Sequence, residues 1–434
     1  MKETVALTPQ SEVRNQPRIR PHVLWVLVAL LAVLGVLQVL FSWAEIVSSG
    51  MDIQQDFIAA QRLWAGGDIY APITPAEVAA LGVHEEYGVG MRLNVHPPLT
   101  ALLFAPLALL SFPAATLIWT LGSVALLFAL LWLFMDELDL PLHGPWRWFV
   151  LLLILIWYPV WQHLHVGQFT ILLLGLLAGA WWCERRGHPW LAGVLVGAAT
   201  MLKIYPALFL GLALLRGRWR VLGGAALCML ALLAAQMAVN PLQWAQYFSQ
   251  VAPANAATWM PNARNASLAT ISMRLFVGSD EVRPFFNAPQ FELPTRLLLY
   301  GIAGGILALV FWRRRAQTDY TADYALGLSA IALLSPLSWD HSFIFLLMPF
   351  AYIWQQVRLR PGPWRRWALG LVFIALLLSL FPAELVFANL KRAFLLQQMP
   401  PWVHFHAVGV WVLLCGYIAT LVTVWPRSVV EEAR

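Results

Sequence analysis

Long runs of apolar residues, separated by short polar breaks, dominate the pattern along this chain. Many runs approach the ~20 residues that a helix needs to cross roughly 30 Å of hydrocarbon. We therefore predict an all-α polytopic membrane protein. Full spans are expected to begin near Val23, Phe112, Trp148, Phe169, Val221, Leu297, Ala325, Phe343, Trp367 and Ala407.

Two apolar segments do not fit a simple span. The segment "PPLTALLFAPLALL" (97–110) is short and is closed by Pro113, so we expect it to dip into the bilayer and return. The segment "LAGVLVGAATMLKIYPALFLGLALL" (191–215) carries Lys203 and Pro206 in its middle. Two half-helices that meet near "KIYP" explain this pattern, because irregular backbone at membrane depth is tolerated under a cover of protein or water. The sequence then predicts about twelve membrane helices, counting the halves.

Composition supports the membrane assignment. Hydrophobic residues make up 60% and charged residues 12% of the 434 residues, outside the range of soluble globular domains. The three cysteines lie inside or at the end of apolar runs, so we expect neither a disulfide framework nor a metal-ligand set. The first apolar run is expected to be a retained span, not a removed signal peptide. We regard 1–434 as a single transmembrane domain.

Basic residues cluster in the breaks between spans, which is the positive-inside pattern of cytoplasmic segments. The formal net charge is +6, but the basic residues lie in short loops and not along an aromatic face, so nucleic acid is not an expected partner. Both termini are predicted to be cytoplasmic. The basic segments are Arg14 to Arg20, "ERRGH" (184–188), "RGRWR" (216–220), "RRR" (313–315), "RLRPGPWRR" (358–366) and "PRSVVEEAR" (426–434).

This topology predicts that the remaining polar segments share the opposite, external face, where we expect any chemistry to occur. These segments are 45–96, "WQHLHVGQ" (161–168), a long loop at about 240–290, and "SPLSWDH" (335–341).

The first external segment contains two candidate carboxylates. After Met51, "DIQQDFIAAQRLWAGG" predicts an amphipathic surface helix that ends at a glycine pair. Asp52 could simply be its N-cap, with Gln55 completing a capping box, and Asp56 could be a solvated surface charge. The functional alternative is a carboxylate that acts as general base on a hydroxyl group. The residues alone leave both interpretations open.

Other candidate side chains lie in the same four segments. They are Arg92, Asn94 and His96 in "RLNVHPPL", His163, His165 and Gln168 in "HLHVGQF", Arg264, Asn265, Ser267 and Arg274 in "PNARNASLATISMRL", and Trp339, Asp340 and His341 in "SPLSWDHSF". Each set has a structural explanation: prolines fix the path of the chain, His and Gln are common at interfaces, Asn265 begins a chance glycosylation sequon, and Asp340 could cap a helix. Functionally, Trp339 could stack on a sugar ring and His341 could donate to a phosphate.

Lys203 differs from these residues because a lysine is costly in hydrocarbon. We expect it to face a cavity and an anion; the alternative is that its side chain snorkels to an interface. Together the candidates suit transfer of a group from a lipid phosphate to a hydroxyl, with fixed donors stabilising the leaving phosphate. A transporter or flippase of lipid-linked sugars is the main alternative, and a non-catalytic sugar-lipid-binding subunit is another. No cofactor is expected, and an i, i+2 histidine pair without an acidic partner predicts no metal site.

Six segments resemble, in chain order from residue 52 to about 350, the motifs of glycosyltransferase family 87, which contains polyprenyl-phosphate-mannose-dependent mannosyltransferases of the GT-C class. They are "DIQQDFIAAQRLWAGGDIY", "NVHPPLTALLFAPLALL", "HVGQFTILLLGLLAGAWW", "LAGVLVGAATMLKIYPALFL", "RNASLATISMRL" and "SPLSWDHSFIFLLMP". The resemblance implies a GT-C fold whose external loops, at about 45–96 and 240–290, frame the site. It also implies a polyprenyl-phosphate-linked sugar donor, with mannose as the expected sugar, a glycolipid or glycan acceptor, and inverting transfer.

The resemblance also implies roles for individual residues. Spacing back from Tyr70 puts the general base at Asp52, whereas Asp56 and His96 stand at positions where the family commonly has Tyr or another residue. His341 inherits a role near the donor phosphate. The implied substrate-binding residues are Asp56, His96, Gln168, Lys203, Asn265, Trp339 and His341.

Overall fold

The computed structural model describes residues 21–83, 93–279, 281–315, 317–380, 399–406 and 408–425. Within these ranges the regular secondary structure is helical, apart from one isolated β-bridge between Val282 and Met399, and turns and loops join the helices. The predicted all-α class is therefore confirmed. Several predicted features lie outside the described residues, namely Arg14, Arg18, Arg20, Arg92, Ala407 and the segment 426–434.

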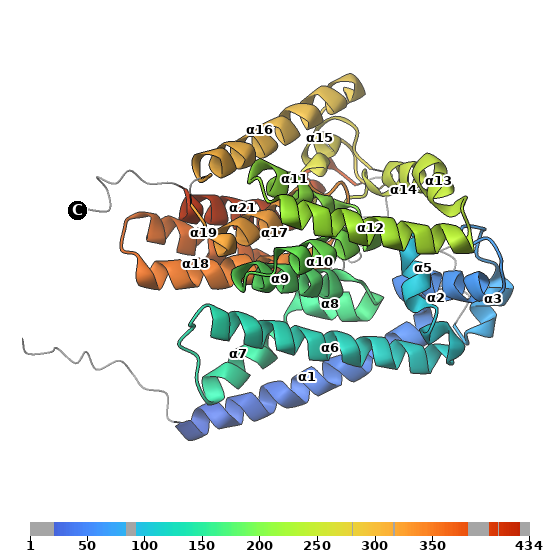
Figure 1. The fold of residues 1–434 in the computed structure, drawn as a ribbon, viewed down its shortest axis with the longest axis horizontal. Helices are drawn as coiled ribbons and strands as arrows, with labels where there is room; N and C mark the ends of the chain where they lie inside the picture. The colour runs from blue at the N-terminus through green and yellow to red at the C-terminus, as the bar shows by residue number, and fades with distance from the viewer. Residues whose placement is uncertain are drawn as a thin grey trace, which may run out of the picture.

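Four helices of the described residues are long and apolar enough to cross a membrane on their own. They are α1 (Pro21–Ser49), α6 (Phe112–Glu137), α12 (Trp219–Val239) and α16 (Glu292–Arg313). All four run along the length of the molecule in Figure 1. Large apolar side chains such as Leu37, Leu121 and Leu230 are exposed on their outer faces, as expected where lipid is the solvent. The chain is a multi-pass membrane protein, and the total of about twelve membrane helices stays a prediction.

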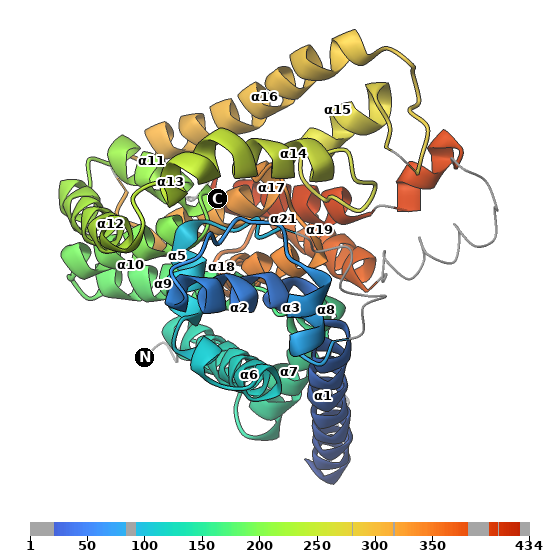
Figure 2. The ribbon, with the colours of Figure 1, turned by 90° about the vertical axis from the view of Figure 1, so that its right-hand side faces the viewer.

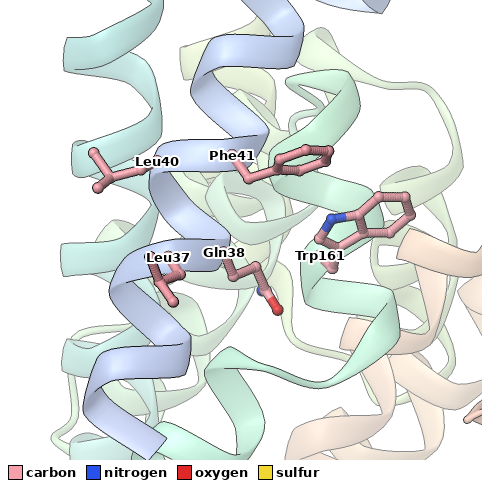
Figure 3. Close-up of a pocket in the computed structure, with 5 residues that line it drawn as sticks. All are labelled: Leu37, Gln38, Leu40, Phe41 and Trp161. Carbon is pink, nitrogen blue, oxygen red and sulfur yellow. The ribbon is translucent and has the colours of Figure 1, made fainter.

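A break divides the span that the sequence predicted from Trp148. It consists of α7 (Pro145–Leu155) and α8 (Tyr158–Val166), which are bent by 55°. Pro159 cannot donate the backbone hydrogen bond that the Leu155 carbonyl would otherwise accept. The side-chain amide of Gln38 on α1 donates to that carbonyl instead, at 2.6 Å. Gln38 lines a shallow, mostly apolar groove between α1 and α8, together with Leu37, Leu40, Phe41 and Trp161 (Figure 3).

The predicted pair of half-helices is present. The half-helices are α10 (Pro189–Leu202) and α11 (Leu208–Leu215), with the short 3₁₀ helix η2 (Tyr205–Ala207) between them. They follow helix α9 (Thr170–Arg185). Helix α10 ends at Lys203, whose backbone is extended. Arg218, just beyond α11, forms a 3.1 Å ion pair with Glu184 in the last turn of α9. The two half-helices therefore return to the end of the bundle from which they start, with Lys203 at their tip.

The C-terminal half supplies the centre of the bundle. Its elements are α17 (Tyr320–Leu334), the 3₁₀ helix η5 (Asp340–Leu346), α18 (Leu347–Leu359), α19 (Trp364–Ser379), the 3₁₀ helix η6 (Pro401–His406) and α21 (Gly409–Val424). Helix α17 is buried along almost its whole length and packs against α9, α18 and α21. The span predicted from Phe343 begins as 3₁₀ helix and becomes α-helical only at Leu347.

Short helices cover one end of the bundle. They are α2 (Met51–Trp64), α3 (Pro75–Ala80), α5 (Pro98–Phe104), η1 (Leu107–Leu109), α13 (Gln243–Gln246), the π-helical η3 (Tyr247–Val251), α14 (Ala252–Trp259), α15 (Ala269–Phe276) and η4 (Pro289–Phe291). Figure 2 views this end and shows α2 and α14 lying across it. The segment 97–110 forms the short helices α5 and η1 and no full-length span, and its dip into the bilayer stays a prediction. The predicted loop 240–290 is largely helical, which the sequence did not indicate.

The basic segments gather at the other end, as predicted. Arg186 pairs with Glu137 at 2.7 Å, Arg216 pairs with Asp323 and donates to the carbonyl of Arg314, and Arg358 donates to the carbonyl of Asp139 at 2.9 Å. We call this cluster of linked polar segments the basic end. The end covered by α2 and α14 is the site end.

Candidate active site

Asp52 lies in the first turn of α2, directly after a tight turn from α1. The turn is made by Gly50 and Met51, whose φ angles are 74° and 45°. Gly50 is the N-cap of α2 and offers no capping side chain, so of the two interpretations left open for Asp52, the capping box with Gln55 is wrong. The Gln55 side chain instead accepts from the backbone N–H of Val95, at 2.9 Å. The Asp52 carboxylate therefore has no capping role and meets a partner outside α2.

That partner is Gln168, whose amide donates to the Asp52 carboxylate. Gly167 ends α8 in the left-handed conformation, with φ of 74°. A Cβ at this position would lie 2.7 Å from the Cβ of Ile53 on α2. Glycine thus permits the close approach of α8 and α2 that brings Gln168 to Asp52.

The environment of Asp52 suits a base. Its side chain is half-buried. Burial raises its pKa above the usual value, and this effect outweighs the nearby charges of His96 and Lys203 and the hydrogen bond from Gln168, which act in the opposite direction. A carboxylate with a raised pKa binds a proton more readily, which favours proton abstraction from a hydroxyl group.

Asp56, one turn later, is in a different situation. It is 1% exposed, so the interpretation as a solvated surface charge is wrong. Its two oxygens lie 2.9 and 3.0 Å from Nδ1 of His96. The backbone of His96 is held in turn, because the Tyr70 hydroxyl donates to its carbonyl at 2.9 Å and its N–H donates to Asn94 at 3.0 Å. The Asp56 carboxylate is therefore occupied by a contact with another buried side chain, whereas the Asp52 side chain stays partly exposed.

Lys203 is close to both carboxylates. Its ammonium lies 5.8 Å from the ring centroid of Phe169, the residue after Gln168, and interacts electrostatically with Asp52 and Asp56. In the part of the chain that the structure describes, the ammonium forms no ion pair or hydrogen bond. The hairpin tip thus places a cation beside the two aspartates without neutralising it by a direct contact.

Two buried histidines belong to the same cluster. His163 on α8 is 1% exposed and His341 on η5 is 7% exposed, and the two elements pack against each other. His341 interacts electrostatically with His163, Lys203 and His96. Both ring nitrogens of His163, and Nδ1 of His341, have no hydrogen-bond partner among the described residues.

Sequence reasoning treated His163 and His165 alike, as residues comfortable at an interface. The structure separates them. His165 is half-buried and its ring stacks on Trp161, with centroids 4.6 Å apart. Burial of His163 follows from a stripe formed with Val160 and Leu164, which is a helical pattern. That stripe is the only signal in the sequence that could have distinguished the two histidines.

Asn265 connects the segment 261–275 to the segment 335–341. Its Oδ1 accepts from the backbone N–H groups of Ser267 and Ser338, each at 3.0 Å, and its Nδ2 donates to the carbonyl of Pro336 at 3.0 Å. The amide is fully buried and its hydrogen bonds are made inside the protein. Asn265 therefore fixes the backbone that leads to His341.

Trp339 lies on that backbone. It is half-buried, and its ring packs edge to face with Trp259, with centroids 5.9 Å apart. Its backbone N–H donates to the Ser342 hydroxyl at 3.2 Å. Trp339, not Asp340, occupies the N-cap of η5, so the predicted capping role of Asp340 is wrong. The tryptophan pair offers a partly exposed aromatic surface two residues before His341.

The structure thus brings most of the predicted site residues together. Asp52, Asp56, His96, Gln168, Lys203 and His341 are linked by contacts or electrostatic interactions. Asn265 and Trp339 join them through the backbone before His341. Across the described ranges, no group of three or more His, Cys, Asp or Glu side chains is arranged to hold a metal ion.

Known proteins share this sequence pattern. The model of glycosyltransferase family 87 matches residues 94–338, more than half of the chain. That range includes His96, Gln168, Lys203 and Asn265. No solved structure matches, so the GT-C arrangement stays a prediction.

Curated relatives cover much of the chain. A polyprenol-phosphate-mannose-dependent alpha-(1-2)-phosphatidylinositol mannoside mannosyltransferase of Mycolicibacterium smegmatis is 27% identical over 363 residues, which are 77% of each chain. The Mycobacterium tuberculosis protein of the same description is 26% identical over 352 residues, 76% of each chain. A phosphatidylinositol pentamannoside mannosyltransferase of M. smegmatis is 28% identical over 261 residues, 58% of each chain.

Proposed function

The chain belongs to glycosyltransferase family 87, and we propose that it transfers mannose from a polyprenyl-phosphate donor to a hydroxyl group of a glycolipid acceptor. The relatives described above carry names that specify polyprenol-phosphate-mannose and phosphatidylinositol mannosides. The cluster at the site end has the groups that such a transfer needs: a base, fixed cationic or N–H donors, and an aromatic surface.

Asp52 is the proposed general base, and one contrast carries this assignment. Among the described residues, the half-buried Asp52 carboxylate is hydrogen-bonded to the Gln168 amide alone, whereas Asp56 is buried against His96. In the proposed step the acceptor hydroxyl gives its proton to Asp52 while its oxygen forms a bond to C1 of the sugar. The bond from C1 to the phosphate oxygen breaks, and its electron pair leaves with the phosphate. Attack opposite to the leaving group inverts the configuration at C1.

Lys203 and His341 are proposed to stabilise the leaving phosphate. Charge grows on the phosphate oxygens as the bond to C1 breaks, and donors fixed in advance are most effective there. Lys203 suits this role because this half-buried residue places its ammonium near the base without a direct ionic partner in the described residues. The flat ring of Trp339, which packs edge to face with Trp259, suits contact with a sugar ring.

Asp56 and His96 are proposed to position other groups. A carboxylate on Nδ1 keeps the proton on that nitrogen and leaves Nε2 as an acceptor. The His96 ring also packs edge to face with Phe169, with centroids 5.3 Å apart, and Phe169 adjoins Gln168. The pair of Asp56 and His96 therefore supports the segment at Phe169 that brings Gln168 to Asp52.

We propose that the site end faces the exterior and that both termini are cytoplasmic, because arginine-rich segments collect at the basic end. A transporter of lipid-linked sugars would need polar groups along a path through the bundle. In the described residues the buried Asp323 and Glu184 of the basic end are instead paired with Arg216 and Arg218, which leaves Lys203 as a separate cation near the site end.

The test is transfer of radiolabelled mannose by the purified protein. Synthetic polyprenyl-phosphate-mannose is offered as donor with a phosphatidylinositol mannoside fraction as acceptor, and GDP-mannose serves as the control donor. We expect a glycolipid product only with the polyprenyl donor. Binding of that donor without any transfer to glycolipids would contradict the proposed reaction, and product from GDP-mannose would contradict the proposed donor.

A further inference from the structure

The cluster around Lys203 contains more buried polar atoms without partners than proton abstraction by Asp52 explains. Both nitrogens of His163 and Nδ1 of His341 lack a hydrogen bond in the described residues, and both side chains are more than nine-tenths buried. Buried polar atoms are normally paired because leaving them unpaired is costly. Three such unpaired nitrogen atoms on two neighbouring side chains indicate that a bound ligand supplies their hydrogen-bond partners.

We propose that His163 binds the phosphate group of the lipid-linked donor, together with Lys203 and His341. The inference rests on the proposed function and adds to it a residue that the motifs and the family resemblance do not assign. The imidazole N–H of His163 donates to a phosphate oxygen that carries the developing negative charge.

The geometry of α8 supports this role. The 55° bend at the start of α8 and the left-handed turn at Gly167 fix the helix between α2 and η5. His163 lies on the buried stripe of α8, whereas His165, two residues later, lies on another face and stacks on Trp161. Of the two histidines on α8, only His163 is fully buried, and it interacts electrostatically with His341.

The chemistry of the neighbours favours an anion. The ammonium of Lys203 interacts electrostatically with His341, and a cation in this position would repel a metal ion. An ammonium and two imidazoles supply N–H donors, which match the acceptor oxygens of a phosphate. The nearest carboxylates, Asp56 and Asp52, are hydrogen-bonded to His96 and Gln168, and the ammonium of Lys203 interacts electrostatically with both and offsets their charge.

Two lipids could supply such a phosphate: the polyprenyl-phosphate donor and the phosphodiester of a phosphatidylinositol acceptor. The donor phosphate adjoins C1, the atom that the acceptor oxygen must reach near Asp52. Lys203 interacts electrostatically with Asp52 itself, so a phosphate on Lys203 lies near the reacting atoms. We therefore assign His163 to the donor, and the experiment includes both lipids.

The experiment measures equilibrium binding to the purified full-length protein. The probes are polyprenyl phosphate, polyprenol without phosphate, and phosphatidylinositol. His163→Leu should weaken polyprenyl phosphate binding about 10- to 100-fold, the range for a lost hydrogen bond to a charged group. His163→Gln keeps an N–H donor and should lose less. His165→Gln is the matched control on the same helix and should bind like the wild type.

A thermal unfolding measurement separates binding from a structural role. If His163 serves a ligand, His163→Leu should leave the melting temperature of the ligand-free protein unchanged or raise it, because the apolar side chain leaves no buried polar atom unpaired. Loss of polyprenyl phosphate and polyprenol binding together, or a clear fall in melting temperature for both His163 variants, would overturn the proposal.

The remaining outcomes are also distinct. Unchanged binding of polyprenyl phosphate by His163→Leu would overturn the role of His163 while leaving the transferase function intact. A selective loss of phosphatidylinositol binding would overturn the assignment to the donor. If the wild-type protein bound no polyprenyl phosphate and transferred no mannose, the proposed function itself would be wrong, and this inference with it.

Discussion

The two ends of the bundle differ in whether their central charged side chains are paired within the protein. At the basic end, Asp323 lies between Arg216 and Arg218, and Arg218 also reaches Glu184 at 3.1 Å. The side chains of Arg216 and Asp323 are each 3% exposed, so these charges are removed from solvent and neutralise one another. At the site end, Lys203 has no direct ionic partner in the described residues. Buried charges that are paired within the protein hold elements together, and a buried charge left unpaired indicates a ligand.

The hairpin of α10 and α11 connects the two ends. Its base is fixed by Arg216 and Arg218, and its tip carries Lys203. Helix α10 also packs closely on α12, because a Cβ on Gly193 would lie 2.1 Å from the carbonyl oxygen of Val221. The ion pairs at one end and this close approach along the flank together position the cation at the other end.

The largest effect is expected from Asp52→Asn. It removes the proposed base while keeping an oxygen that can accept from Gln168, so kcat should fall by about 10²- to 10⁴-fold with donor binding retained. Transfer of labelled mannose and equilibrium binding of polyprenyl phosphate measure the two quantities. Asp56→Asn should cost less, about 10- to 100-fold, because it acts through His96. The opposite ranking would assign the base to Asp56.

Lys203→Met should have the next largest effect, a loss of about 100-fold in kcat, since one fixed donor to the leaving phosphate is removed. The same substitution should raise the melting temperature of the ligand-free protein, because a buried charge without a direct partner disappears. Lys203→Arg is the control and should recover part of the activity. A fall in both activity and melting temperature would place Lys203 among the residues that hold the fold, as at the basic end.

Much of the helix arrangement could be predicted from the sequence, because it follows from the free-energy cost of placing charge and irregular backbone in hydrocarbon. The break at Lys203 is an example: a lysine followed by Pro206 in an apolar run has few other solutions. The grouping of basic segments at one end follows from the positive-inside pattern. These inferences depend on local composition alone.

The site itself depends on contacts that local patterns do not contain. Asp56 and His96 are 40 residues apart in the chain, and their pairing requires the turn at Gly50 and the path of 93–97. For the same reason the sequence left Asp52 and Asp56 as competing candidates. The break before Pro159 was not predicted, because a full span was expected from Trp148, and its compensation by Gln38 requires α1 to lie beside α7. His163 and His165 differ in burial, and the short stripe of Val160, His163 and Leu164 was too weak a pattern to predict this difference.

Asp323→Asn tests the other side of the comparison. It leaves Arg216 and Arg218 without their shared partner, and breaking a buried ion pair in this way costs about 3 kcal/mol of unfolding free energy. Thermal unfolding in detergent measures the loss, and the donor KM of the protein that stays folded should not change. Asp136→Asn is the matched control: Asp136 pairs with Arg147 but its side chain is 52% exposed, so less than about 1 kcal/mol is expected. Equal losses for both variants would mean that burial does not distinguish these pairs.

The smallest expected effect is a shift in pH dependence. Asp52 must be ionised to act as a base, and burial raises its pKa above the usual 3.8, so kcat/KM should fall on acidification at a higher pH than for an ordinary aspartate. The hydrogen bond from Gln168 opposes this rise, so Gln168→Leu should move the acid limb to still higher pH. Gln356→Leu, a buried amide on α18, should leave the limb in place. A limb that moves with Asp56→Asn but not with Gln168→Leu would belong to the Asp56 and His96 pair, and the contrast drawn between the two carboxylates would be wrong.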